Sequence, residues 1–108
     1  MRLLLDHCVP RKSAASLAEH EVYTAAQQGW TVLRNGDLLS AAAAAGFDAL
    51  LTVDQNLRYQ QNQMTLPLSV VVLIAASNQL AQLQRLVPPL RRALISLPDR
   101  SYIEVVPD

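Results

Sequence analysis

The chain has 108 residues, 51% of them hydrophobic and 17% charged, which supplies one core and leaves no room for a second domain. Nine basic and nine acidic residues give a net charge of zero, so no global field steers the protein onto nucleic acid or anionic membranes. Cys8 is the only cysteine, which excludes an intramolecular disulfide and a multi-cysteine metal site. Because the N-terminus lacks a signal-peptide pattern and no run approaches the roughly 20 apolar residues of a membrane span, we expect a cytoplasmic protein without a membrane segment.

The first half of the chain alternates between short apolar runs and helical patterns. Pro10 suits the first position of a helix, and Asn35-Gly36 marks a turn before the next helix. In order, the sequence predicts a strand at Arg2–Leu5, a helix near Arg11–Ala18, a strand nearer the sheet edge at Glu21–Thr24, a helical turn at Ala25–Gly29, a helix at Asp37–Ala45 closed by Gly46, and a strand at Asp48–Val53.

The second half begins with a polar segment, Asp54–Met64, that has room for one helical turn, followed by a central strand at Ser69–Ala75. Beyond it, apolar residues recur at spacings of three and four without a break in phase, at Leu80, Leu83, Val87, Leu90, Leu94 and Leu97. Pro88 and Pro89 lie inside this stripe, and a proline within a helix costs roughly 3 kcal/mol. The stripe therefore predicts one kinked helix, or two helices end to end, on one sheet face, with Tyr102–Val106 as an edge strand.

This alternation predicts the fold class. Strands that alternate with helices favour a three-layer α/β/α sandwich around a mainly parallel sheet of about five strands, with Rossmann-like topology and right-handed crossovers. We expect residues 1–108 to form that single domain.

Two of the apolar runs end on an aspartate, Asp6 after the first strand and Asp54 after the third. Parallel strands deliver their last residues to one edge of the sheet, where ligands bind. The two carboxylates are therefore expected in one acidic pocket, which repels itself unless protons or a divalent cation neutralise it. Each residue also has a structural alternative: Asp6 can cap the following helix, and Asp54 can form an Asx-turn.

Other polar residues are expected near the same edge. Asp37 opens a helix, where a carboxylate gains about 0.3 to 1 kcal/mol from the dipole without any catalytic role. His7 and Cys8 follow Asp6, but catalytic zinc usually needs three protein ligands, so we assign them packing or supporting roles. Four basic side chains at this edge are candidates for phosphate binding, or else a solvated rim: Arg11, Lys12, Arg34 and Arg58.

The chain resembles a small bacterial PIN-like domain of uncharacterised function over nearly its whole length. The resemblance is carried by Leu3-Leu4-Leu5-Asp6, by Asn35-Gly36-Asp37-Leu38-Leu39 before a helix, and by Leu51-Thr52-Val53-Asp54-Gln55-Asn56-Leu57 after a strand. PIN domains are metal-dependent ribonucleases, so the resemblance implies Asp6, Asp37 and Asp54 as ligands of Mg²⁺ or Mn²⁺. Hard cations of this kind prefer oxygen ligands, activate water and neutralise charge on the phosphate. Many members are toxins neutralised by a partner protein.

The chain departs from that pattern at three places. Short relatives often carry Asp-Glu-Asn-x-Pro where this chain has Asp6-His7-Cys8-Val9-Pro10, and often an acid at the positions of Asn35 and Asn56. Each change removes negative charge and lowers the expected cation affinity. Asn56 still offers an amide oxygen to a metal or to a metal-bound water.

Our primary hypothesis is an endoribonuclease that cuts single-stranded RNA, in the manner of a toxin with an antitoxin partner. The alternative is a catalytically weakened PIN-like module that binds RNA or a protein. A third hypothesis, a receiver-like domain phosphorylated on aspartate, predicts a lysine late in the chain, whereas the only lysine is Lys12. The apolar composition is compatible with a homodimer.

Overall fold

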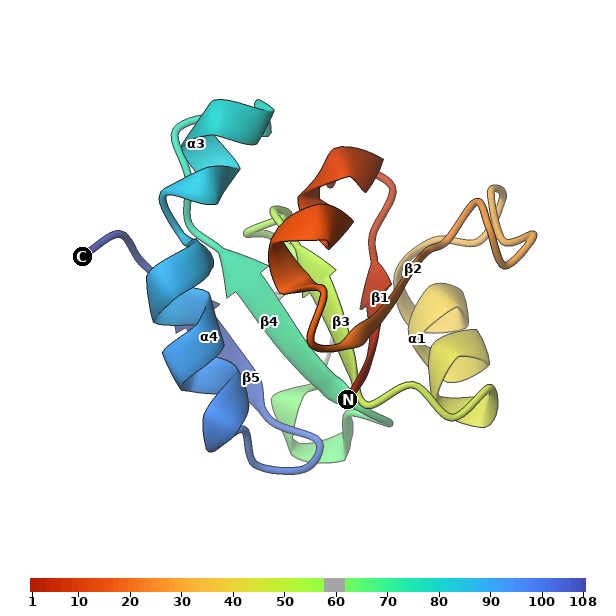
Figure 1. Ribbon diagram of the computed structural model, residues 1–108. Helices are drawn as coiled ribbons and strands as arrows, with labels where there is room; N and C mark the ends of the chain where they lie inside the picture. Colours follow the sequence, from red (N-terminus) through yellow and green to blue (C-terminus); the bar gives the residue numbers. More distant parts are fainter. Residues whose placement is uncertain (58–61) are drawn as a thin grey trace.

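Five short parallel strands form a single sheet in the order β2-β1-β3-β4-β5 (Figure 1). The computed structural model describes residues 1–57 and 62–108. The strands are β1 (Arg2–Leu5), β2 (Glu21–Thr24), β3 (Ala49–Thr52), β4 (Ser69–Leu73) and β5 (Tyr102–Val105). All five predicted strands are present, and Glu21–Thr24 and Tyr102–Val105 occupy the two edges, as their sequences predict.

The helical elements are η1 (Arg11–Leu17), α1 (Asn35–Ala44), η2 (Gln63–Thr65), α3 (Leu80–Gln84) and α4 (Val87–Ile95). Two of them, η1 and η2, are 3₁₀-helices. In the described part of the chain, no helix combines the length and the apolar character needed to cross a bilayer.

The side chains of each inner strand alternate between the two faces of the sheet. On one face, Leu3 and Leu5 pack in a core with buried residues of η1, α3 and α4. On the other face, Leu4 packs with Leu38 and other buried residues of α1. Both faces are covered, which explains why β1, β3 and β4 read as continuous apolar runs. The predicted α/β sandwich with helices on both faces is confirmed.

The stripe beyond β4 folds as two helices end to end, the second of the two predicted arrangements. Helix α3 ends at Gln84, and α4 begins at Val87 with Pro88 and Pro89 in its first turn. In that turn the backbone N–H groups have no partner within the helix, so proline costs little there. The apolar stripe keeps its phase across the junction, and its buried members Leu83, Leu90 and Leu94 pack in the core on this face of the sheet, together with Leu86 from the junction itself.

Several predicted boundaries were wrong by one or two residues. Strand β4 ends at Leu73, and Pro10 lies just before η1 instead of at its first position. Residues 25–29 form hydrogen-bonded turns without a helix. The larger error concerns Asn35-Gly36, which were predicted to form a turn before the helix but are the first two residues of α1. Asn35 has a φ of 47°, so α1 begins on a left-handed residue.

The chain reverses its direction of travel across the sheet at β1. It passes from β1 to β2 on one side and then returns to place β3 on the other side of β1. The connections that leave β1 and β3 consequently diverge, and a crevice opens between them at the carboxyl ends of these strands. This topological switch point is where ligands bind in open parallel sheets.

Candidate functional site

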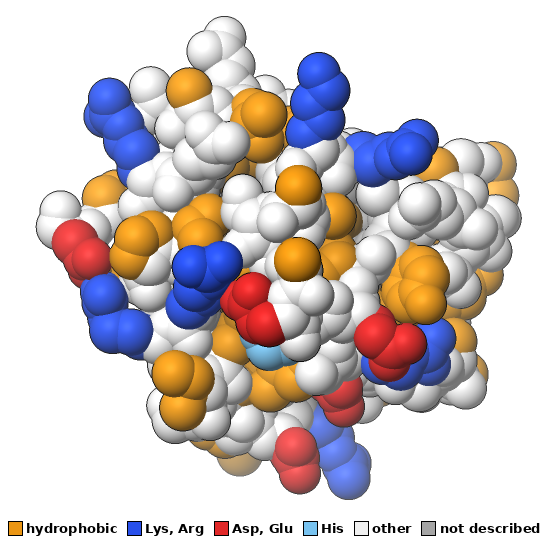
Figure 2. Space-filling model, viewed as in Figure 1, with side chains coloured by type: hydrophobic (Ala, Val, Ile, Leu, Met, Phe, Trp, Pro, Cys, Tyr) orange, Lys and Arg blue, Asp and Glu red, His pale blue; other side chains and the backbone are white. Residues whose placement is uncertain are grey.

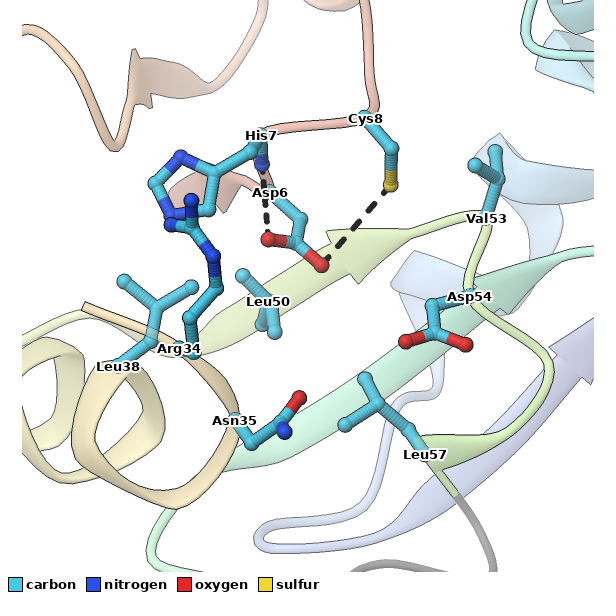
Figure 3. A pocket seen from close by; sticks show the side chains of 10 residues that line it. All are labelled: Asp6, His7, Cys8, Arg34, Asn35, Leu38, Leu50, Val53, Asp54 and Leu57. Carbon is cyan, nitrogen blue, oxygen red and sulfur yellow. Dashed lines mark hydrogen bonds between the residues drawn. The ribbon is translucent and has the colours of Figure 1, made fainter. Parts of the chain in front are cut away.

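A cavity of about 320 Å³ lies at the switch point between β1 and β3 (Figure 3). Its apolar wall consists of Leu38, Leu50, Val53 and Leu57. Its polar lining comes from three separate segments of the chain: Asp6, His7 and Cys8 after β1, Arg34 and Asn35 at the start of α1, and Asp54 after β3. The structure therefore brings Asp6 and Asp54 to one cavity, 48 positions apart in sequence, at the predicted edge of the sheet.

Asp6 is held by hydrogen bonds to both carboxylate oxygens. The backbone N–H of His7 donates to Oδ1 over 2.7 Å, and the Thr52 hydroxyl donates to Oδ2 over 2.8 Å. Its own backbone N–H donates to the Leu51 carbonyl over 3.0 Å and extends the pairing of β1 with β3 by one residue. The carboxylate is therefore fixed in orientation before any ligand binds.

Asp54 is held from two sides as well. Its backbone N–H donates to the Thr52 hydroxyl oxygen over 3.0 Å, and its Oδ1 accepts from the backbone N–H of Asn56 over 2.9 Å. The second contact is the Asx-turn that the sequence offered as a structural alternative. The turn does not take the carboxylate out of the site, because Asp54 lines the cavity and its side chain points into the same space as Asp6 (Figure 3).

Thr52 links the two aspartates and is fully buried, with 0% of its surface exposed. Its single hydroxyl donates to Asp6 and accepts from the backbone of Asp54. Thr52 was not among the site residues predicted from the sequence. A signal was present, because Thr52 is a polar residue at the end of a strand that is otherwise apolar.

The third oxygen-bearing side chain of the cavity is Asn35 and not Asp37. The Asn35 side chain points into the cavity in Figure 3, and its left-handed backbone is a conformation that asparagine tolerates better than most residues. Asp37 is exposed in the first turn of α1, where it faces the positive end of the helix dipole, and it is not part of the cavity lining. Asn56 is exposed and also lies outside the lining. Metal binding by Asp37 and Asn56 stays a prediction.

Two cationic or potentially cationic side chains stand at the mouth of the cavity on the α1 side. The His7 ring bonds through Nε2 to the Leu33 carbonyl over 2.7 Å. Arg34 donates from one guanidinium nitrogen to the carbonyls of Thr31 and Leu33, over 2.8 and 3.1 Å. The predicted position of Arg34 near the acidic edge is thus observed, and its remaining guanidinium N–H groups stay available to an anion.

Cys8 closes the cavity on the η1 side. Its sulfur lies 3.9 Å from Asp6 Oδ2 and 3.7 Å from the Thr52 hydroxyl oxygen, with the side chain partly buried. These contacts agree with the supporting role expected for it. Arg11 and Lys12 are exposed at the start of η1, and Arg58 lies outside the described residues.

The donor set of this cavity fits a hard divalent cation. Asp6 and Asp54 offer carboxylate oxygens and Asn35 offers an amide oxygen, and each carboxylate keeps acceptor positions beyond its hydrogen bonds. Mg²⁺ is commonly bound through one or two carboxylates together with water and substrate phosphate, and Mn²⁺ has similar preferences. Within residues 1–57 and 62–108, no group of three or more His, Cys, Asp or Glu side chains is arranged to hold a metal. A closed zinc site is therefore not formed by these residues.

Comparison with protein-family models, with curated proteins and with solved structures finds no match to this chain.

Proposed function

We propose that the protein is a cytoplasmic, cation-dependent endoribonuclease of PIN-like type that cuts single-stranded RNA. The observation that carries the proposal is the meeting of Asp6 and Asp54 in one cavity at the switch point of the sheet. Two carboxylates that line one cavity attract a cation that neutralises their charge, and a phosphodiester is a substrate that such a cation attracts.

In this proposal Asp6 and Asp54 hold Mg²⁺ or Mn²⁺, and the amide oxygen of Asn35 completes the protein ligands. When bound, the ion supplies an activated water and neutralises charge on the phosphate being cleaved. Thr52 holds the Asp6 carboxylate in orientation through its 2.8 Å hydrogen bond. Arg34 and His7, at the mouth of the cavity, bind the phosphate oxygens and position the RNA backbone.

The test is cleavage of an end-labelled single-stranded RNA with added Mn²⁺, compared with EDTA. Asp6→Asn and Asp54→Asn are expected to lose activity by about 100-fold or more, because substitutions even around a metal site cost 10- to 100-fold. Asp99→Asn is the matched control, because Asp99 is exposed in the turn before β5, at the opposite end of the parallel strands. Equal cleavage by wild type and both site variants would reject the proposal.

A second candidate function is a weakened module of the same fold that binds RNA or a protein without cutting. The amide at Asn35, in a cavity with only two carboxylates, favours this candidate. It predicts no heat of Mg²⁺ binding at millimolar concentration in calorimetry, whereas the nuclease predicts binding that Asp54→Asn removes. If the protein acts as a toxin, its antitoxin is expected to cover this cavity.

A further inference from the structure

Two further hollows lie beside the cavity between Asp6 and Asp54, along the same edge of the sheet. The next hollow, of about 300 Å³, shares Asp6 and His7 with the cavity and extends to Pro10 and Arg11. A third hollow, of about 520 Å³, shares Pro10 and Arg11 with the second and ends at Lys12 and Ala15. Because neighbouring hollows share lining residues, the three lie in a row along this edge, and we call this row the η1 track.

The charge along the η1 track changes sign from one end to the other. The cavity contains two carboxylates and Arg34, the middle hollow contains Asp6 together with Arg11, and the last hollow contains Arg11 and Lys12 without an acid. Among the described residues, neither Arg11 nor Lys12 forms an ion pair. In Figure 2, Lys and Arg side chains project along the upper edge of the molecule, where no acidic side chain is visible.

We infer that the η1 track binds the RNA strand on one flank of the phosphate that is cleaved. The inference rests on the proposed function and adds the path of the bound strand over the protein surface, from the cavity past His7 and Pro10 to Lys12. Arg11 and Lys12 pair with successive phosphates of that flank, and the apolar surfaces of Pro10 and Ala15 lie beside the bases.

The polarity favours RNA over an acidic peptide as the occupant. A polynucleotide repeats its negative charge along the whole backbone, so one chain can present a phosphate to the cation between Asp6 and Asp54 while it presents others to Arg11 and Lys12. Because the protein has no net charge to attract polyanions, binding must depend on such local groups.

The experiment measures binding of fluorescein-labelled single-stranded RNA by anisotropy, in EDTA and at several salt concentrations. The EDTA removes the cation, so the measurement reports the η1 track separately from cleavage. The double variant Arg11→Gln/Lys12→Gln is expected to reduce the slope of log affinity against log salt by about 1.4, at about 0.7 for each phosphate that no longer has a cationic partner. At 0.1 M salt this corresponds to a loss of about 25-fold in affinity.

Two control variants make the result specific to position. Arg92→Gln/Arg100→Gln removes the same charge from exposed residues of α4 and of the turn before β5, and it is expected to keep the wild-type slope. Arg11→Lys/Lys12→Arg keeps both charges and is expected to retain the wild-type affinity and salt dependence. Thermal unfolding of each variant tests whether the domain remains folded.

The possible results separate this inference from the function on which it rests. If wild type cleaves RNA with Mn²⁺ but Arg11→Gln/Lys12→Gln binds with an unchanged slope, the η1 track is rejected and the nuclease stands. An equal reduction of the slope in Arg92→Gln/Arg100→Gln would show a general charge effect and would also reject the track. Equal competition by polyglutamate would assign the track to acidic peptides and overturn the inference. If wild type neither cleaves nor binds RNA, the proposed function fails.

Discussion

The buried hydroxyl of Thr52 donates a 2.8 Å hydrogen bond to the carboxylate of Asp6, across the pairing of β1 with β3. The same hydroxyl accepts the backbone N–H of Asp54. The Thr52 hydroxyl on β3 therefore holds both the carboxylate of Asp6, which follows β1, and the backbone of Asp54, which follows β3. The sheet brings Asp6 and Asp54 together, and Thr52 orients the carboxylate of Asp6 and the backbone of Asp54.

Thr52→Val should separate the role of this hydroxyl from the volume of the side chain. Valine has nearly the same shape but removes the donor to Asp6 Oδ2 and leaves the partly buried N–H of Asp54 without its acceptor, which costs about 1–3 kcal/mol of stability. We expect Mn²⁺ affinity, measured by calorimetry, to fall 10- to 100-fold, as for other groups that orient metal ligands. Thr52→Ser keeps the hydroxyl and should retain most of the affinity; a serine variant as weak as the valine variant would contradict this role.

Asn35 should respond in opposite ways to two substitutions. Asn35→Asp adds a third carboxylate to the cavity, so cation affinity should rise, while stability in EDTA should fall through repulsion with Asp6 and Asp54. Asn35→Gly removes the amide but suits the φ of 47°, so we expect weaker cation binding with unchanged or slightly higher stability. Calorimetry and thermal unfolding in EDTA measure the two properties. Unchanged cation affinity in both variants would exclude Asn35 as a ligand.

Asp37 provides a direct comparison with Asp54. Because Asp37 is exposed in the first turn of α1 and does not line the cavity, Asp37→Asn should remove only the dipole interaction, about 0.3–1 kcal/mol. RNA cleavage should fall far less than in Asp54→Asn, and the two rates measured side by side test this. A loss as large as that of Asp54→Asn would restore Asp37 to the ligand set that the PIN-like resemblance implies.

Ser69 should matter for stability and not for the site. Its buried hydroxyl donates to the Pro98 carbonyl over 2.7 Å and accepts from the backbone N–H of Ser101 over 3.2 Å, at the end of the sheet away from the cavity. Ser69→Ala should destabilise by about 1–3 kcal/mol, which lowers the Tm by several degrees in a domain of this size. Ser101→Ala removes only a hydroxyl that bonds the same carbonyl at the surface, and its Tm should change less.

The sequence predicted the architecture well because strands that are buried on both faces consist almost entirely of apolar residues. Runs such as Leu3-Leu4-Leu5 and Val70-Val71-Val72 are typical of strands in the middle of a covered sheet, and turns separate them clearly. The meeting of Asp6 and Asp54 followed from the same logic, since parallel strands share one edge. The sequence left open whether α3 and α4 form one kinked helix or two helices end to end, because an unbroken apolar phase fits both arrangements equally well.

The tertiary structure alone decided which polar side chains accompany the two aspartates. Asn35 and Asp37 are two positions apart on one helix, and only the left-handed start of α1 and its packing against β1 and β3 turn Asn35 into the cavity. Thr52 gained its role from the register that places its hydroxyl between two neighbouring strands. Periodicity specifies the face on which a residue lies, whereas contacts between residues distant in sequence depend on register and loop conformation, which local patterns do not encode.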